Sequence, residues 1–274
     1  MRLIDTHTHL DALDQQGILP AALSRARAAG LEALITIGTE PDDWTRGREL
    51  AASAPGYIYH TVGLHPCSVG PDWATAVAQL PGHWADGPGP RPIALGECGL
   101  DRFHLPAEPA AAERMFADQR SAFAAQLALG REHGCPLVIH SRGAFAECMA
   151  MIEASGVDWR KVVFHCFSEG PAEIAELNRR GGRGSFTGIL TYKNAEAVRA
   201  AARAQPRELL MLETDAPYLA PVQHRGKPNE PALMRHTADA AAALLGLSGD
   251  DLGALTSDNA RAFFGLPAFG LMSS

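Results

Sequence analysis

Paired cysteines, lysine and long apolar runs are scarce in this sequence of 274 residues. Its five cysteines are an odd number without Cys-x-x-Cys spacing, which excludes zinc fingers and favours free thiols in a reducing compartment over a disulfide framework. No uncharged stretch approaches the roughly 20 apolar residues of a membrane span, and the first residues lack a basic segment followed by an apolar run. We therefore expect a soluble, cytoplasmic protein.

Positive charge is also in deficit, because Lys and Arg total 24 against 31 Asp and Glu, a net charge of −7. A protein that holds nucleic acid by backbone electrostatics alone is expected to be basic, so that class is excluded. Any affinity for phosphate must be local. The hydrophobic content of 46% is typical of a globular chain, and we expect a monomer with no obligate protein partner.

Eight short runs of strand-forming residues recur along the chain, at 3–7, 34–38, 57–63, 92–96, 136–140, 162–166, 183–188 and 209–213. Nearly continuous apolar runs of this length are typical of parallel strands that are buried on both faces. Alanine-rich helical segments lie between them, the clearest at 108–132, where Phe116, Phe123 and Leu127 recur at helical spacing. The alternation predicts an α/β fold, a (β/α)8 TIM barrel, in a single domain over residues 1–274. We interpret the Gly- and Pro-rich residues 80–92 as a connection within it.

Polar side chains follow most of these strands at the point where each strand ends. The carboxyl ends of barrel strands share one face, where barrel enzymes keep their active sites, so we expect these side chains to converge. His7 and His9 are two residues apart and point the same way on a strand, which allows both to bind one ion. Four more candidate ligands lie at other strand ends: Glu97, His140, His165 and Asp215. The sequence therefore predicts a metal site on this face.

The candidate ligands are more numerous than one tetrahedral ion needs. Two ions about 3.5 to 4 Å apart that share a carboxylate would use all six ligands and form the clamp that phosphoryl-transfer hydrolases employ. Glu97 follows the fourth strand and is the natural bridge. A mixed set of imidazoles and carboxylates suits Zn²⁺ or Mn²⁺, whereas Mg²⁺ prefers oxygen ligands and keeps waters. We predict two divalent cations (Mg, Mn or Zn) as cofactors.

Motifs spread over almost the whole chain resemble those of the TatD family of metal-dependent deoxyribonucleases, within the amidohydrolase group of barrel hydrolases. They are IDTHTHLD (4–11), GLHP (63–66), GECGLD (96–101), IHSR (139–142), HCFS (165–168), ETDAPYL (213–219), RGKPNEP (225–231) and TSDNARAFFGL (256–266). Three departures concern substrate preference: Thr8 replaces a usual Cys, Cys67 stands where His is frequent, and Arg102-Phe103 replaces a pair of aromatics.

The resemblance assigns the ligands to two ions. It implies that His7, His9 and Asp215 hold one ion, that His140 and His165 hold the other, and that Glu97 holds both. Other branches of the group bridge their ions with a carbamylated lysine on the fourth strand. This chain has no lysine there, its three lysines being Lys161, Lys193 and Lys227. The glutamate-bridged branch is therefore favoured.

The resemblance also implies a DNase that trims single strands from a 3′ end. In our hypothesis a metal-activated water attacks phosphorus and Asp215 accepts its proton. His65, Arg142 and Arg225 then hold phosphate oxygens. Two other interpretations stay open, because Arg142 could instead pair with a carboxylate and His65 could cap a helix. Two cations against Glu97 and Asp215 leave the pocket at about +2, which would attract a phosphodiester to an acidic protein.

Several neighbours of these residues have supporting or structural interpretations. Glu213 and Asp5 could each orient a ligand histidine or make a structural hydrogen bond, and Asp101 is interpreted as structural. Surface or core positions are expected for the remaining histidines: His60, His83, His104, His133, His224 and His236. A rim over the metal pocket is expected from the following residues: Asn229, Glu230, Phe103, Phe167 and Tyr218.

Two other functions remain possible from the sequence. The same metal centre could act on D-aminoacyl-tRNA or on a small amide or ester, because a two-metal clamp polarises carbonyls as well as phosphates. A non-catalytic scaffold with this barrel is disfavoured, since such a chain would be expected to lose at least one costly buried polar ligand.

Overall fold

A computed structural model describes residues 1–85 and 89–268, so residues 86–88 of the predicted connection and 269–274 of the predicted domain lie outside it. Eight parallel strands follow one another around a single sheet in chain order, which confirms the predicted barrel. The strands are β1 (Leu3–Thr8), β2 (Leu31–Thr36), β3 (Ile58–Val62), β4 (Ala94–Asp101), β5 (Leu137–Arg142), β6 (Val162–Phe164), β7 (Arg183–Phe186) and β8 (Met211–Leu212).

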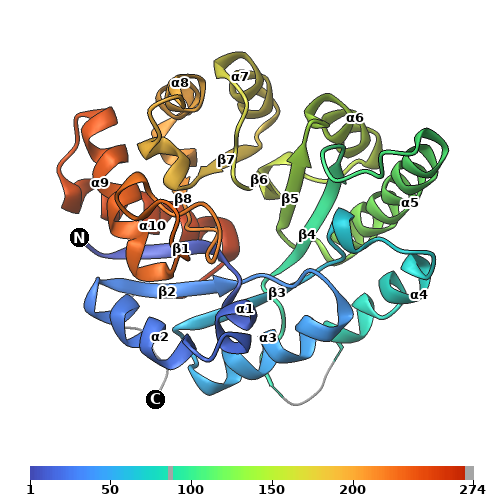
Figure 1. The fold of residues 1–274 in the computed structure, drawn as a ribbon, viewed down its shortest axis with the longest axis horizontal. Coiled ribbons are helices and arrows are strands. Elements are labelled where there is room, and N and C mark those ends of the chain that lie inside the picture. Colours follow the sequence, from blue (N-terminus) through green and yellow to red (C-terminus); the bar gives the residue numbers. More distant parts are fainter. Residues whose placement is uncertain (86–88, 269–274) are drawn as a thin grey trace.

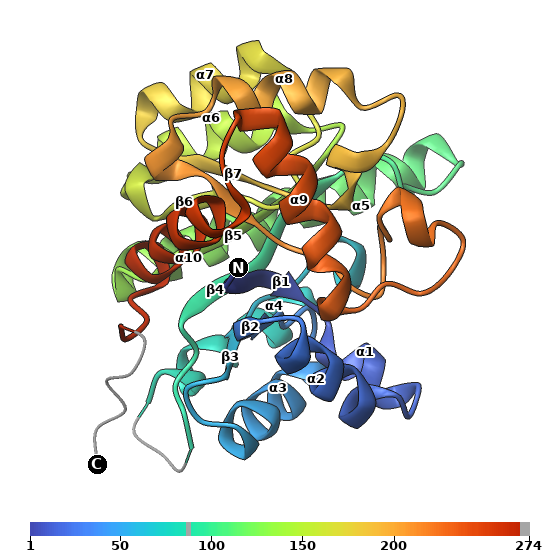
Figure 2. The same ribbon diagram turned by 90° about the vertical axis from the view of Figure 1, so that its left-hand side faces the viewer.

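Helices enclose the strands on the outside, and Figure 1 shows them following one another around the barrel. They are α1 (Leu10–Gln15), α2 (Leu19–Ala28), α3 (Pro41–Ser53), α4 (Trp73–Val77), α5 (Pro109–His133), α6 (Phe145–Ser155), α7 (Pro171–Arg180), α8 (Glu196–Ala204), α9 (Met234–Leu245) and α10 (Gly249–Phe264). In the side view of Figure 2, α6 to α8 lie on one side of the strands and α1 to α3 on the opposite side. Within the described residues, no helix is long and apolar enough to cross a membrane.

The barrel closes through residues that follow β8. Thr8 forms an isolated parallel bridge with Ala216, and the backbone N–H of Asp215 donates to the carbonyl of His7 at 2.9 Å. β8 itself is shorter than the predicted strand over 209–213, because Arg207–Leu209 form a 3-10 turn and the pairing with β7 ends at Leu212. Asp215 then takes a left-handed backbone conformation, with φ of 56°, directly before Ala216, which bridges to Thr8.

The strands are rich in apolar residues because apolar side chains pack on both of their faces. Inside the barrel, Ile4, Ile35 and Val138 pack together with Phe263 of α10. Outside, the predicted apolar face of α5 is confirmed, since Phe116, Phe123 and Leu127 belong to the core between the sheet and the helices. Burial on both faces removes a large apolar area from water and holds the strand ends rigidly, which positions the polar side chains that follow.

Candidate metal centre

The six predicted ligands converge at the carboxyl ends of the strands. His7 lies on β1 and His9 directly after it, Glu97 lies on β4, and His140 lies on β5. The last two ligands follow strands, His165 after β6 and Asp215 after β8. Glu97 and His7 are almost fully buried, at 2% and 0% exposure. Residues more than 200 positions apart in the sequence thus share one small volume.

One half of the centre brings His7, His9 and Asp215 together, with His7 also facing one oxygen of Glu97. His7 Nε2 lies 3.2 Å from Glu97 Oε2 and 3.6 Å from Asp215 Oδ1. His9 Nε2 lies 3.4 Å from the same Asp215 oxygen. The expectation that His7 and His9 face one point is therefore consistent with the geometry. The ligand atoms of His7, His9 and Glu97 lie within 4.8 Å of one another, with Asp215 beside both histidines, and imidazoles with carboxylates are a ligand set for a divalent cation.

The other half surrounds the second oxygen of Glu97. Glu97 Oε1 lies 2.6 Å from His165 Nε2 and 2.8 Å from His140 Nδ1. His65 Nε2 is also close, at 3.4 Å from Glu97 Oε1 and 3.1 Å from His140 Nδ1. The two carboxylate oxygens of Glu97 therefore face different histidines, Oε2 facing His7 and Oε1 facing His140 and His165, as a bridging ligand requires.

The protonation states of Glu97 and His7 favour metal binding. Burial alone would raise the pKa of Glu97, but the surrounding histidines, His165 foremost, hold it well below its usual range. Burial lowers the pKa of His7, so its imidazole is neutral. Histidine binds metal as the neutral ring and glutamate as the carboxylate, so these two groups already hold the forms that a cation needs.

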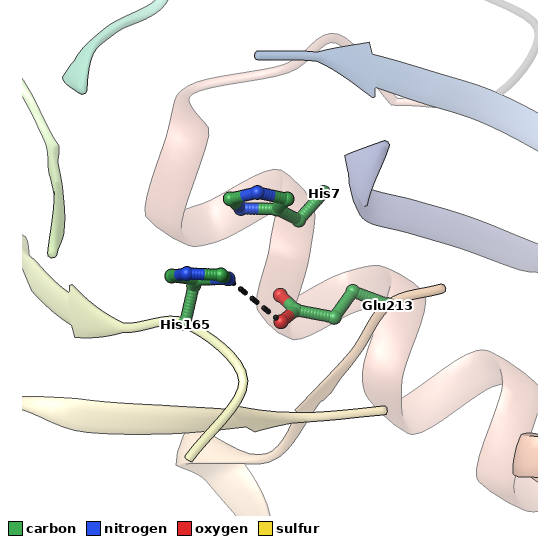
Figure 3. Close-up of side chains that lie close together, drawn as sticks. All are labelled: His7, His165 and Glu213. Carbon is green, nitrogen blue, oxygen red and sulfur yellow. Dashed lines mark ion pairs between the residues drawn. The ribbon is translucent and has the colours of Figure 1, made fainter. Parts of the chain in front are cut away.

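Two further carboxylates contact the outer nitrogens of the ligand histidines. Asp101 Oδ2 lies 3.1 Å from His140 Nε2, and Glu213 Oε1 lies 3.4 Å from His165 Nδ1. In Figure 3 the rings of His7 and His165 lie face to face, with centroids 3.9 Å apart, and Glu213 approaches His165 from the side. Carboxylates in such positions fix the tautomer and orientation of metal-binding histidines. Asp101, interpreted as structural from the sequence, thus contacts a candidate ligand directly.

Asp5 could either orient a ligand histidine or make a structural hydrogen bond, and it makes the structural hydrogen bond. Its oxygens accept hydrogen bonds from the backbone N–H and the hydroxyl of Thr214 at 2.9 and 2.6 Å. It accepts a third from the backbone N–H of His7 at 3.3 Å and makes no described contact with the His7 ring. Burial raises the pKa of Asp5 to about 7. The carboxyl group ties β1 to the end of β8 and so holds His7 beside Asp215.

The buried donor set fits divalent cations. Among the described residues, neither ring nitrogen of His7 has a hydrogen-bond partner, although Nε2 faces two carboxylates. An unsatisfied buried imidazole is costly, and a cation between it and the carboxylates would remove that cost. The expected charge of about +2 counted only Glu97 and Asp215 against two cations, and Asp101 and Glu213 place two more carboxylates beside the ligands.

The three predicted phosphate-binding residues lie in different surroundings. His65 lies within the centre, where its Nδ1 accepts from the backbone N–H of Cys67 and so also caps a 3-10 turn. Arg142 is exposed and stacks on the ring of Phe103 at 4.0 Å, with no described carboxylate partner. Arg225 is exposed and lies 4.5 Å from the ring of Tyr192, without a described contact to the six ligands.

The predicted rim is only partly present. Tyr218 and Phe103 are exposed at 59% and 68%, and Tyr218 meets the ring of His9 edge to face at 5.9 Å. Phe167 is wrong as a rim residue because it is 3% exposed in the core. Asn229 is also wrong as a lid residue, since its buried amide donates to the carbonyls of Thr214 and Tyr218.

The loop after β8 is therefore fixed rather than free to close over the pocket. Glu230, the other predicted rim residue, pairs with Arg25 of α2. This ion pair directs the Glu230 carboxylate toward α2. The prediction that this segment overhangs the pocket as a lid is wrong for both residues, because each is held by partners outside the metal centre.

The remaining histidines occupy the expected core or surface positions, and His104 is exposed but has a partner that the sequence did not indicate. His60 is buried on β3, and His133 stacks on Trp84. His104 Nδ1 lies 2.7 Å from Asp101 Oδ2, at the edge of the metal centre. Sequence reasoning missed it because its spacing from Asp101 becomes meaningful only when the turn after β4 folds the ring back.

Comparison with known proteins agrees with this geometry. The model of the family described as TatD related DNase matches residues 4–265. An uncharacterized metal-dependent hydrolase of Escherichia coli (strain K12), YcfH, is 33% identical over 276 residues, covering 100% of this chain and 99% of YcfH. The protein named 3'-5' ssDNA/RNA exonuclease TatD of Musicola paradisiaca is 32% identical and covers 96% and 98% of the two chains.

Solved structures of TatD family proteins have a similar fold. The TatD homologue YJJV of Escherichia coli K12 superposes with a TM-score of 0.87 at 27% identity, covering 97% of this chain and 99% of that one. A TatD family hydrolase of Entamoeba histolytica, at 17% identity and a TM-score of 0.78, shares the fold. With the family match over almost the whole chain and the convergent histidines and carboxylates, this protein belongs to the TatD family of metal-dependent hydrolases.

Proposed function

We propose that this protein is a DNA exonuclease that hydrolyses phosphodiester bonds from the 3′ end of single strands with two divalent cations. The observation that carries the proposal is the position of Glu97, whose Oε2 faces His7 at 3.2 Å while its Oε1 faces His165 and His140 at 2.6 and 2.8 Å. A single shared carboxylate between two ligand sets is what a two-metal phosphoryl-transfer site needs.

In this proposal His7, His9 and Asp215 would hold one cation, His140 and His165 would hold the other, and Glu97 would be shared by both. Cations bound there would supply an activated water at neutral pH and neutralise the charge that develops on phosphorus. Asp101 orients His140 by accepting from its outer nitrogen, and the Glu213 carboxylate faces the outer nitrogen of His165 at 3.4 Å, which keeps the inner nitrogens directed at the proposed cation positions.

Asp215 is the proposed proton acceptor. Its carboxylate is buried, and hydrogen bonding from His9 together with the charges of nearby histidines outweighs burial and holds the pKa of Asp215 below its usual value. The Asp215 side chain is 12% exposed, and the residue itself takes the left-handed backbone conformation that follows β8. A general base must be within hydrogen-bond reach of the attacking water, and Asp215, 3.4 Å from His9 Nε2, would have this role.

Three observations support single-stranded DNA as the substrate. Arg142 is exposed at the mouth and can hold a phosphate through two parallel hydrogen bonds. Tyr218 and Phe103 present exposed rings on which unpaired bases can stack without sequence preference. Relatives at 32 to 34% identity carry the name 3'-5' ssDNA/RNA exonuclease. His65 and Arg225 complete the proposed phosphate contacts, and residues 1–274 are proposed to act as one domain.

The test is a comparison of substrates under defined metal conditions. Purified protein is incubated with 5′-labelled single-stranded DNA, the matching duplex, RNA of the same sequence, a D-aminoacyl-tRNA and a generic ester. Each is tested with chelator and with Mg²⁺, Mn²⁺ or Zn²⁺. We expect a ladder of products shortened from the 3′ end of the single strand, abolished by chelator. Intact DNA under every metal condition, with turnover of the ester or the aminoacyl-tRNA, would overturn the proposal and favour the alternative hydrolase.

A further inference from the structure

A second cluster of metal-binding side chains lies at the edge of the centre described above. Cys67 follows β3 in a 3-10 turn over Pro66–Ser68, Asp101 is the last residue of β4, and His104 lies in the turn beyond it. Cys67 Sγ, Asp101 Oδ2 and His104 Nδ1 lie within 4.8 Å of one another. None of the three belongs to the six predicted ligands.

The distances in this cluster match those of a tetrahedral zinc site. Zinc bonds of about 2.3 Å to sulfur and about 2.0 to 2.1 Å to nitrogen and oxygen place the ligand atoms about 3.6 Å apart for S···N, about 3.5 Å for S···O and about 3.3 Å for N···O. Cys67 Sγ lies 3.6 Å from His104 Nδ1 and 3.5 Å from Asp101 Oδ2. His104 Nδ1 and Asp101 Oδ2 are 2.7 Å apart because they share a hydrogen bond.

The distance between His104 Nδ1 and Asp101 Oδ2 can increase by movement of the His104 ring, whereas Asp101 is held in place. The His104 side chain is 50% exposed, so its ring can move by the about 0.6 Å that the tetrahedral geometry requires. The Asp101 side chain is 0% exposed, and its Oδ1 accepts from the backbone N–H groups of Phe103 and His104 at 2.7 and 2.9 Å. The cluster thus has one fixed, buried ligand and two that are accessible from solvent.

We propose that Cys67, Asp101 and His104 form a third cation site, with a preference for Zn²⁺ and similarly thiophilic ions, at the rim of the metal centre. A thiolate ligand distinguishes this site from the six, which offer only imidazole and carboxylate. Three protein ligands leave one tetrahedral position, which water or a phosphate oxygen can occupy. Binding releases the thiol proton of Cys67 to solvent, since the thiolate is the form that binds metal.

The rim site adjoins the main centre through one atom. Asp101 Oδ2, the proposed ligand, also lies 3.1 Å from His140 Nε2. A carboxylate oxygen has two lone pairs, so it can bind a cation on one side and accept from an imidazole on the other. A cation at the rim therefore reduces the basicity of the acceptor that orients His140. Loading of the rim site and of the main centre should accordingly affect each other.

The test measures bound metal without any substrate, so its outcome does not depend on nuclease activity. Protein stripped with chelator is dialysed against Zn²⁺ for metal analysis and against Co²⁺ for absorption spectroscopy. We expect three Zn²⁺ per chain and a thiolate-to-cobalt charge-transfer band for the unsubstituted protein. Cys67→Ala and His104→Gln should each bind one Zn²⁺ fewer, and Cys67→Ala should lose the band.

Matched variants separate the rim site from other thiols and from the main centre. Cys135→Ala, which removes a partly buried thiol at the opposite end of β5, should keep three Zn²⁺ and the band. Glu97→Gln should lose cations from the main centre and keep the band. The same Zn²⁺ content in Cys67→Ala as in the unsubstituted protein, or a cobalt band that survives in that variant, would overturn the proposal. Circular dichroism checks that each variant is folded.

Discussion

Replacing Glu97 by glutamine tests the shared carboxylate on which the proposed mechanism depends. The change keeps the shape of the side chain and removes the negative charge that both proposed cations share. Each cation present at 100 times its Kd stabilises the fold by about 2.7 kcal/mol, so two contribute about 5 kcal/mol. For a chain of this size, that stabilisation raises Tm by about 10 to 20 °C at about 2 to 4 °C per kcal/mol.

The expected result is a protein that folds but no longer gains stability from metal. Removal of a single transition-state hydrogen-bond donor typically costs about 10² to 10³ in kcat, so loss of a ligand to both cations should cost at least about 10³-fold. Differential scanning fluorimetry with and without Mn²⁺, metal analysis and a single-turnover nuclease assay measure the three consequences. The increment in Tm should fall to less than half of its value in the unsubstituted protein.

A matched control is available on the same face of the barrel. Glu147 of α6 is a 37% exposed carboxylate that pairs with Arg102, and Glu147→Gln should change stability by at most about 1 kcal/mol. Its metal content and its response to Mn²⁺ should equal those of the unsubstituted protein. If Glu97→Gln retained both cations and the full increment in Tm, the bridging role would be refuted, because a neutral amide does not replace a shared carboxylate.

Three further predictions concern other parts of the molecule. Asp101→Asn should weaken metal binding by about 10- to 100-fold, since it removes the carboxylate that orients His140, and isothermal titration would measure this loss. Tyr218→Ala should raise KM for single-stranded DNA with little change in kcat, by the about 1 to 3 kcal/mol that one stacked base contributes. Burial, together with the charges of Arg48 and His83, lowers the pKa of His60 to about 4, so stability should fall by about 1.4 kcal/mol per unit as pH drops from about 6.5 to about 4.

Each of these predictions has a result that would contradict it. Unchanged metal affinity in Asp101→Asn would mean that His140 is oriented by its other contacts alone. A drop in kcat at constant KM for Tyr218→Ala would place that ring in catalysis instead of binding. For His60, urea unfolding in the presence of chelator is compared with His60→Leu, which lacks a titrating group. If the free energy of unfolding changed equally with pH in the two proteins, burial would not be what keeps His60 neutral in the fold.

The histidine pairs and the strand periodicity could be interpreted without coordinates. Apolar runs at regular intervals predicted the barrel, and a barrel brings every strand end to one mouth, so His7, His140 and Asp215 were expected together. The positions of Asn229 and Phe167 could not be predicted, since both follow strands in loops whose paths depend on long-range contacts. Asn229 donates to carbonyls of another turn, and Phe167 packs in the core, so neither reaches the rim.

By itself, the amino-acid sequence determined the fold class, the face that carries chemistry and the types of ligand available there. These follow from periodicity and residue chemistry, which act locally and are repeated eight times around the barrel. The tertiary structure alone decided which oxygen of Glu97 faces which histidine, and that Asp101 contacts both His140 and His104. Such pairings depend on sub-ångström placement of side chains from separate strands, and only packing of the whole barrel sets them.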